Sequence, residues 1–180
     1  MTAMQGSDSG WMMNFKQDIK DLRRPSQGYN SDKFTITGLL QHDKDFSIFN
    51  YLVRKAKLEC ILDSYVTDCT ILIPSDTFLR KKYPEQFFVS INYLAAKDIV
   101  LSQILNKSVT LQMLMSSDSL RLPTKHRSGR YLSINSNYCP TTNIITINNF
   151  AKIIEGNIML NNGIVHITDN LLFPLDCSND

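Results

Sequence analysis

The sequence predicts an α+β fold, and three observations lead to this prediction. Apolar residues recur at helical spacing over 46–56 and again over 87–94. A single short β-branched run, 70–73, stands between these two regions. After residue 119, β-rich runs follow one another without helical patterns between them. Helices and strands are therefore segregated along the chain, which argues against an alternating α/β fold.

The chain has 180 residues and a net charge of +2, with 43% hydrophobic and 20% charged residues. This length fits one domain with a tail, and the composition fits a folded core. The small net charge gives no reason to expect nucleic acid as the default partner. No apolar run is long enough for a membrane span, and the first residues lack a secretory signal pattern. We therefore expect a protein that stays inside the cell that makes it, or one whose leader has been removed.

The four cysteines form no C-x-x-C pair, so the usual zinc spacing is absent. They are Cys60, Cys69, Cys139 and Cys177. Because the chain is long enough to build a core without disulfides, we expect free thiols. Secretion is the alternative, and it predicts disulfides and a glycan at Asn106.

Residues 1–33 are rich in Ser, Gly, Gln and Asp and form a predicted N-terminal arm before a domain at 34–180. Phe15, Ile19 and Leu22 recur at helical spacing, but this stripe is too short to be stable alone. The arm is either a frayed tail or a segment held against its own domain or a neighbouring chain. These three apolar residues are therefore candidate partner contacts.

The domain opens with a predicted helical turn at 36–40 and continues with a longer amphipathic helix. Asp45 or Ser47 can cap the start of that helix. Its predicted buried face consists of Phe46, Phe49, Leu52, Val53 and Ala56.

The run 70–73 predicts a buried strand, which Pro74 ends. Ser75 is the predicted N-cap of the next helix, with a hydroxyl that accepts the free amides of the first turn. Asp76 suits the positive end of that helix dipole, and Phe78 is expected to fold back onto the core.

Residues 84–105 predict one or two helices. Asp98 interrupts the apolar spacing and can cap a second helix that carries Leu101 and Leu105.

Strands are predicted at 131–134 and 144–147, with the polar stretch 135–143 as the loop between them. A final pair of β-rich runs flanks Asn162-Gly163. Because Asn-Gly tolerates positive φ at both central positions of a turn, this dipeptide is the strongest hairpin signal in the chain.

Two segments together resemble the signature segments of fasciclin-like domains. TILIPSDTFL, at 70–79, resembles the family's strand that ends in Pro and leads into a helix with an aromatic residue. NNGIVHITDNLLFP, at 161–174, resembles the family's Asn-Gly-x-x-His-x-x-Asp followed by an apolar pair and a proline. FSIF at 46–49 and the segment LPTKHRSGRYLSI resemble further family segments, and the match covers 36–175 in the family's order.

The resemblance implies a wedge of about seven β-strands packed with several helices, no catalytic site, and a role in adhesion or protein–protein interaction. It implies structural roles for Pro74, Ser75, Asp76, Phe78, Asn162, Gly163, His166, Asp169 and Pro174. We expect His166 to bond a buried backbone group rather than a metal, because no nearby His or Cys completes a ligand set. We expect Asp169 to cap a local turn. No cofactor or metal is expected.

Two departures from the family bear on its partners. Ser102-Gln103 stands where animal matrix members often carry Tyr-His. Glu-Gly-Asn-Ile-Met at 155–159 stands where integrin-linked members carry Glu-Pro-Asp-Ile-Met. The amide of Asn157 cannot coordinate a divalent cation as a carboxylate would. We therefore expect the fold to transfer to this chain but not integrin binding.

A basic loop without acidic residues is the clearest charged feature, and it contains His126 together with Arg121, Lys125, Arg127 and Arg130. The loop can dock an acidic partner or a phosphate backbone, or it can be a solvated hairpin loop. Beyond Lys152 the chain carries acidic residues and no Lys or Arg, so two copies could meet head to tail.

The motifs of hydrolases, zinc proteases, P-loop enzymes and dinucleotide-binding enzymes are absent from the sequence. We therefore expect a non-enzymatic module that binds other proteins: copies of itself or neighbouring subunits of an assembly, inside the cell or in a virion. The abundance of Asn, Ile and Lys is typical of AT-rich genomes such as those of large DNA viruses, and favours a minor capsid or cement protein. The alternatives are a secreted or cell-surface adhesion protein, and an enzyme or small-ligand carrier with a cleft near the helices.

Overall fold

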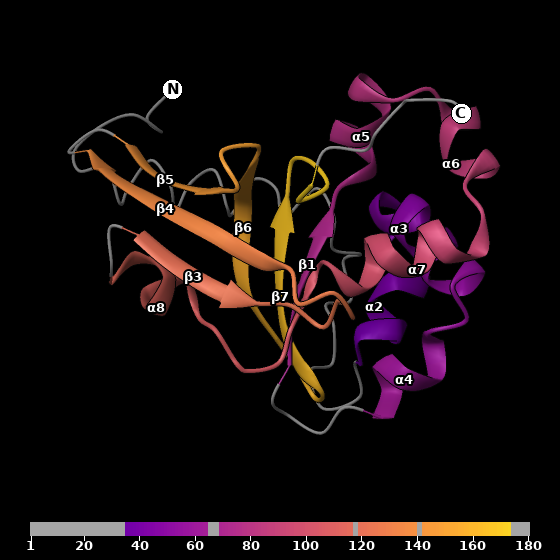
Figure 1. Ribbon diagram of the computed structural model, residues 1–180, viewed down its shortest axis with the longest axis horizontal. Coiled ribbons are helices and arrows are strands. Elements are labelled where there is room, and N and C mark those ends of the chain that lie inside the picture. Colours follow the sequence, from indigo (N-terminus) through magenta and orange to yellow (C-terminus); the bar gives the residue numbers. More distant parts are fainter. Residues whose placement is uncertain (1–34, 65–68, 117–118, 140–141, 174–180) are drawn as a thin grey trace.

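The computed structural model describes residues 35–64, 69–116, 119–139 and 142–173. The predicted arm, with Phe15, Ile19 and Leu22, lies outside these residues, and so does Pro174. The described residues form one mixed seven-stranded sheet with a group of helices beside it (Figure 1). The α+β class and the expectation of about seven strands are confirmed.

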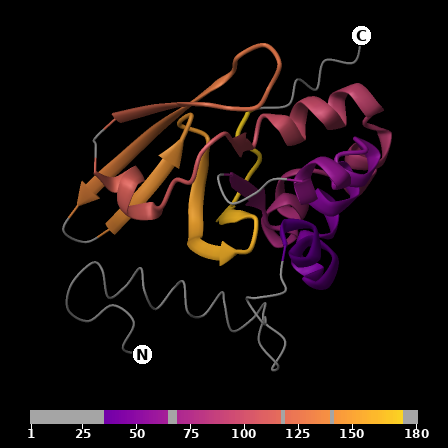
Figure 2. The same ribbon diagram turned by 90° about the horizontal axis from the view of Figure 1, so that it is seen from below.

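The helices lie mainly in the first half of the described chain. They are α2 (Ile36–His42), the 3-10 helix η2 (Lys44–Phe46), α3 (Ser47–Lys55), α4 (Glu59–Ser64), α5 (Asp76–Lys82), α6 (Glu85–Ser90), α7 (Tyr93–Leu101) and α8 (Leu111–Met115). The strands are β1 (Thr70–Pro74), β2 (Ile104–Leu105), β3 (Ser119–Pro123), β4 (Tyr131–Cys139), β5 (Thr142–Ile147), β6 (Ala151–Leu160) and β7 (Gly163–Thr168). Seen from below, α2 to α7 gather on one side and the strands on the other (Figure 2).

The sheet has the strand order β2-β1-β7-β6-β5-β4-β3. β1 and β7 are far apart in sequence but pair in parallel, with Ile71 opposite Val165, whereas the other neighbours are antiparallel. A bridge between Leu105 of β2 and Thr124, just beyond β3, joins the two ends of this order. The sheet is therefore nearly closed, which gives the wedge that the family resemblance implies.

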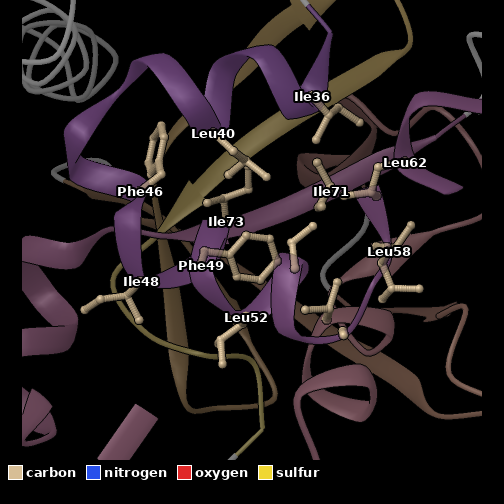
Figure 3. Packing of buried hydrophobic residues seen from close by; sticks show 14 of the residues in the cluster. Ile36, Leu40, Phe46, Ile48, Phe49, Leu52, Leu58, Leu62, Ile71 and Ile73 are labelled. Carbon is tan, nitrogen blue, oxygen red and sulfur yellow. The ribbon is translucent and has the colours of Figure 1, made fainter. Parts of the chain in front are cut away.

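Successive residues of β1 belong to two different cores, because side chains alternate across a strand. Ile71 and Ile73 join the core shared with the helices, whereas Leu72 joins the core between the strands. In the helical core, Phe49 and Leu52 of α3 are fully buried (Figure 3). Because both faces of β1 are covered, its sequence is a continuous apolar run rather than an alternating one.

The boundary between α6 and α7 differs from the prediction. α6 ends at Ser90, and Asn92 caps α7 by accepting a hydrogen bond from the Ala95 amide at 2.8 Å. Asp98, the predicted cap, lies inside α7, and Leu105 belongs to β2 rather than to a second helix. The helix boundary is therefore set by the side-chain cap of Asn92, six residues before the predicted cap, Asp98.

The polar stretch 135–143 is mostly strand, so its prediction as a loop was wrong. β4 continues to Cys139 and β5 begins at Thr142, with Asn135 opposite Thr146. Strand pairing uses backbone groups and needs no apolar side chain. The prediction relied on hydrophobic alternation, which these polar residues do not show.

The predicted hairpin between β6 and β7 is present, but its turn lies one residue earlier than expected. Leu160 pairs with Gly163, so Asn161 and Asn162 are the central turn residues. A Cβ at Gly163 would lie 2.8 Å from the carbonyl oxygen of Cys69. The glycine is therefore required by the close approach of the segment that leads into β1.

Candidate functional site

Two carboxylates cap each other's helices where α3 and α5 begin. Asp76, fully buried in the first turn of α5, accepts hydrogen bonds from the amides of Ser47 (3.1 Å) and Ile48 (2.9 Å) and from the Ser47 hydroxyl. Asp45, just before α3, accepts hydrogen bonds from the amide and the hydroxyl of Thr77, at 3.1 and 2.7 Å. Each negative charge therefore lies at the positive end of the other helix.

Ser75 occupies the N-cap position of α5, but its hydroxyl donates to Asp45 instead of accepting from the amides of α5. That part of the prediction was wrong, because Asp45 already supplies the acceptor. Burial raises the pKa of Asp76, while its hydrogen bonds and the Arg80 guanidinium, 3.5 Å away, act in the opposite direction. The first signature segment thus ties the end of β1 to two helix starts.

His166, fully buried in β7 opposite Leu72 of β1, joins two neighbouring segments through its ring. Its Nε2 donates to the carbonyl oxygen of Val109 at 2.6 Å, and its Nδ1 accepts from the amide of Asn157 at 3.1 Å. The Asn157 side-chain oxygen in turn accepts from the Leu111 amide at 2.8 Å, where α8 begins. A Cβ at Gly156 would lie 2.7 Å from the His166 ring, so β6 can lie this close to the ring only with a glycine at that position. Both ring nitrogens of the histidine therefore contact backbone groups.

Asn162 joins the hairpin to two helices. Its side-chain oxygen accepts from the Ile36 amide at the start of α2, at 2.9 Å. Its amide group donates to the carbonyl oxygen of Leu62 in α4, at 2.8 Å. The first amides and the last carbonyls of a helix have no intrahelical partners. The buried side chain of Asn162 therefore supplies a partner for one amide at the start of α2 and for one carbonyl near the end of α4.

The other signature residues also contact neighbouring segments. Pro74 is the last residue of β1, and Phe78 packs against the helical core. Asp169 accepts a hydrogen bond from the Lys152 amide at 2.8 Å, and its carbonyl oxygen accepts from the Lys82 side chain at 3.2 Å. Asp169 therefore links the end of β7 to the start of β6. The expectation that it caps a local turn was wrong.

The basic loop is docked on α7 through Asp98. The Asp98 carboxylate lies 3.3 Å from Nε2 of His126 and 3.8 Å from Nε of Arg127. Burial lowers the pKa of His126, as does the charge of Arg130, while Asp98 acts in the opposite direction. The loop contains no acid in sequence, but the fold supplies one.

Asp98, His126 and Ser128 line up in the order of a catalytic triad. The Ser128 hydroxyl lies 2.6 Å from Nδ1 of His126, but the Ser128 amide also donates to that nitrogen at 3.2 Å. The Gly129 amide donates to the His126 carbonyl oxygen at 2.9 Å, which closes the turn on itself. The arrangement is therefore that of a closed turn held by its histidine.

The remaining arginines of the loop lie over aromatic rings. The Arg121 guanidinium is 4.5 Å from the ring centre of Tyr131, and the Arg130 guanidinium is 5.0 Å from that of Phe173. The backbone amide of Lys125 donates to the carbonyl oxygen of Ile104 in β2, at 2.9 Å. A role in partner contact was predicted for Arg121, Lys125, Arg127 and Arg130, and it stays a prediction.

A second basic surface, which sequence reasoning missed, lies where the end of α3 meets the α6–α7 junction. We call it the lysine–tyrosine surface, and it consists of Tyr51, Lys55, Lys57, Val89, Tyr93, Leu94 and Lys97. The spacing of Tyr and Lys at i and i+4, twice in this set, is the sequence signal that could have revealed it. An open depression of 460 Å³ adjoins it along the outer face of α3.

Within the described ranges, no group of three or more His, Cys, Asp or Glu residues is placed to hold a metal ion. Over the same residues, every helix is too short or too polar to cross a bilayer.

Comparisons with known proteins agree with this geometry. A family model described as Fasciclin domain matches residues 44–174. A solved FAS1 domain pair from the insect cell adhesion molecule fasciclin I has a similar fold, with a TM-score of 0.67 and 22% sequence identity. The match covers 79% of this chain and 52% of that one, so the chain spans about half the length of that structure. A search of curated proteins gave no significant match.

Proposed function

Because the chain belongs to the Fasciclin domain family, a type of cell-adhesion and protein-interaction module, we propose that it is a non-enzymatic module that binds other proteins. The observation that carries this proposal is how the signature side chains are used. Asp76, Asn162 and His166 direct their polar atoms to backbone groups of segments distant in sequence. They stabilise the fold, so recognition is left to the exposed surface.

The exposed surface supports the proposal in two places. The basic loop presents Arg121, Arg127 and Arg130, and the lysine–tyrosine surface presents cations beside aromatic rings. Tyr and Arg are enriched in protein interfaces, because they offer large contact areas together with polar groups. Both surfaces are suited to acidic protein partners.

We propose further that the protein is a component of a larger assembly, and that a minor capsid or cement role in a large DNA virus fits its composition. The abundance of Asn, Ile and Lys supports this source. The test is chemical crosslinking in the native source followed by mass spectrometry, with light scattering of the purified chain as the measure of self-association. A monodisperse monomer that yields no crosslinks to another protein would count against a binding module.

The alternative is a secreted or cell-surface adhesion protein, and the fold similarity to a domain pair of a cell adhesion molecule favours it. This alternative predicts disulfides and a glycan at Asn106. Intact mass measured without reduction decides between the two, since four free thiols and no glycan would contradict secretion.

A further inference from the structure

The lysine–tyrosine surface combines exposed apolar side chains with ordered lysines. Val89 is 60% exposed, Leu94 is 55% exposed and Tyr93 is 41% exposed. These residues come from the end of α6 and the start of α7, and Tyr51, 39% exposed, comes from α3 next to them (Figure 1). Neighbouring exposed apolar residues of this size mark interaction surfaces more often than isolated ones do.

The lysines are positioned by the aromatic rings and by the backbone. The Lys55 ammonium donates to the carbonyl oxygen of Val89 at 2.8 Å and to the Tyr51 hydroxyl at 3.3 Å. The ammonium groups of Lys57 and Lys97 lie 6.0 and 5.9 Å from the ring centre of Tyr93. Two cations therefore lie beside one ring, at the outer limit of a cation–π contact, while the Lys55 ammonium is held by its hydrogen bonds.

The charge on this surface is one-sided. Within the described part of the chain, no Asp or Glu forms an ion pair with Lys55, Lys57 or Lys97. Arg54 adjoins them and lies 3.8 Å from Glu59, an exposed pair that contributes little. The basic loop differs, because Asp98 already neutralises part of its charge.

We infer that the lysine–tyrosine surface binds an acidic peptide segment of a partner protein, with an apolar side chain of that segment resting on Val89 and Leu94. Carboxylates of the segment meet the three ammonium groups, which form no ion pair with an acid among the described residues. The inference rests on the proposed function, and it adds the location of the contact and the chemistry of the partner.

The test uses the full chain and a fluorescein-labelled peptide in which Glu alternates with Leu. A peptide with Gln in place of every Glu is the uncharged control. Fluorescence anisotropy measures binding to the wild type and to a variant that carries Lys57→Gln and Lys97→Gln. These two lysines were chosen because their ammonium groups make no hydrogen bond with another described residue. The control carries Lys107→Gln and Lys152→Gln, which remove the same charge from exposed positions elsewhere. We expect the surface variant to bind the Glu peptide roughly tenfold more weakly, from two exposed ion pairs, and the control to bind as the wild type does.

A second variant tests the apolar half of the surface without changing charge. Val89→Ser with Leu94→Ser keeps every lysine, and both positions are exposed, so folding is preserved and can be checked by circular dichroism. We expect weaker binding of the Glu–Leu peptide and no change with a Glu–Ser peptide. The inference is overturned if the control variant weakens binding as much as the surface variant, or if the Gln peptide binds as tightly as the Glu peptide. Equal or tighter binding of duplex DNA or of anionic phospholipid vesicles at this surface would also overturn it.

These outcomes separate the inference from the proposed function. Crosslinks to a partner that fall elsewhere on the domain would overturn the location while leaving the binding module intact. Absence of any protein partner in the native source would overturn the proposed function, whatever the peptide does.

Discussion

Removing the Asp76 carboxylate should destabilise the fold more than removing any single exposed acid. In Asp76→Ala, the amide of Ile48, whose hydrogen bond is buried, loses its acceptor, and the partly buried amide and hydroxyl of Ser47 lose theirs. A buried donor left unsatisfied costs about 1–3 kcal/mol, and a lost helix cap costs about 1 kcal/mol. Burial of the carboxylate, which raises the pKa of Asp76, offsets part of this loss. We therefore expect unfolding free energy to fall by about 2–3 kcal/mol.

Asp45→Ala is the informative comparison, because it removes the other half of the reciprocal cap. Its hydrogen bonds with Thr77 are exposed, so water replaces the lost acceptor there, whereas the buried Ser75 hydroxyl also loses its acceptor. The cost should be about 1–2 kcal/mol, below that of Asp76→Ala, because no buried amide is left without an acceptor. Glu85→Ala, in the exposed first turn of α6, serves as the matched control and should change stability by less than about 0.5 kcal/mol.

Urea denaturation followed by circular dichroism measures all three variants, and thermal melting should show Asp76→Ala lowered by roughly 4–12 °C. The order Asp76, then Asp45, then Glu85 is the essential result. If Asp76→Ala is no more destabilising than Asp45→Ala, burial does not decide the cost of losing these caps, and the reasoning is wrong.

The remaining predictions concern a glycine, a histidine and two thiols. Gly156→Ala should destabilise by about 1–3 kcal/mol in urea denaturation, because the new methyl group would lie 2.6 Å from the Leu111 side chain; a neutral effect would mean that α8 moves freely. Since burial lowers the pKa of His126, the unfolded chain binds more protons there, so stability should fall as pH drops below about 6.5, and His126→Asn should reduce that slope. An unchanged slope would assign the acid sensitivity to other groups. Burial raises the pKa of the Cys69 thiol to about 11, whereas Cys60 is exposed. Maleimide should therefore label Cys60 in the native protein and Cys69 only in denaturant, as measured by peptide mapping. Comparable labelling rates at the two positions would show that β1 opens readily.

Elements whose signal is local were predicted well from the sequence. The apolar spacing of Phe49 and Leu52 gave the buried face of α3, since it reflects the helical repeat itself. The β-branched run of β1 and the hairpin between β6 and β7 were also found, the latter with its turn placed one residue too late, because each depends on a few adjacent residues. The family resemblance added the wedge, which no local pattern reveals.

Features that depend on contacts between distant segments were missed or misassigned. The polar end of β4 was predicted as a loop, because its strand state comes from pairing with β5 and not from its own residues. Asp98 was taken for a helix cap, whereas it lies inside α7 and docks the basic loop through His126.

The sequence by itself determined the class of fold, the buried face of α3 and the family, because periodicity and signature segments are properties of neighbouring residues. Only the tertiary structure decided that Asp76 caps the start of α3 while Asp45 caps the start of α5. It also decided that three lysines lie beside the rings of two tyrosines where α3 and α7 are neighbours. A charge or a hydrogen-bond acceptor acts over a few ångströms in space, whatever the number of residues between the two groups along the chain.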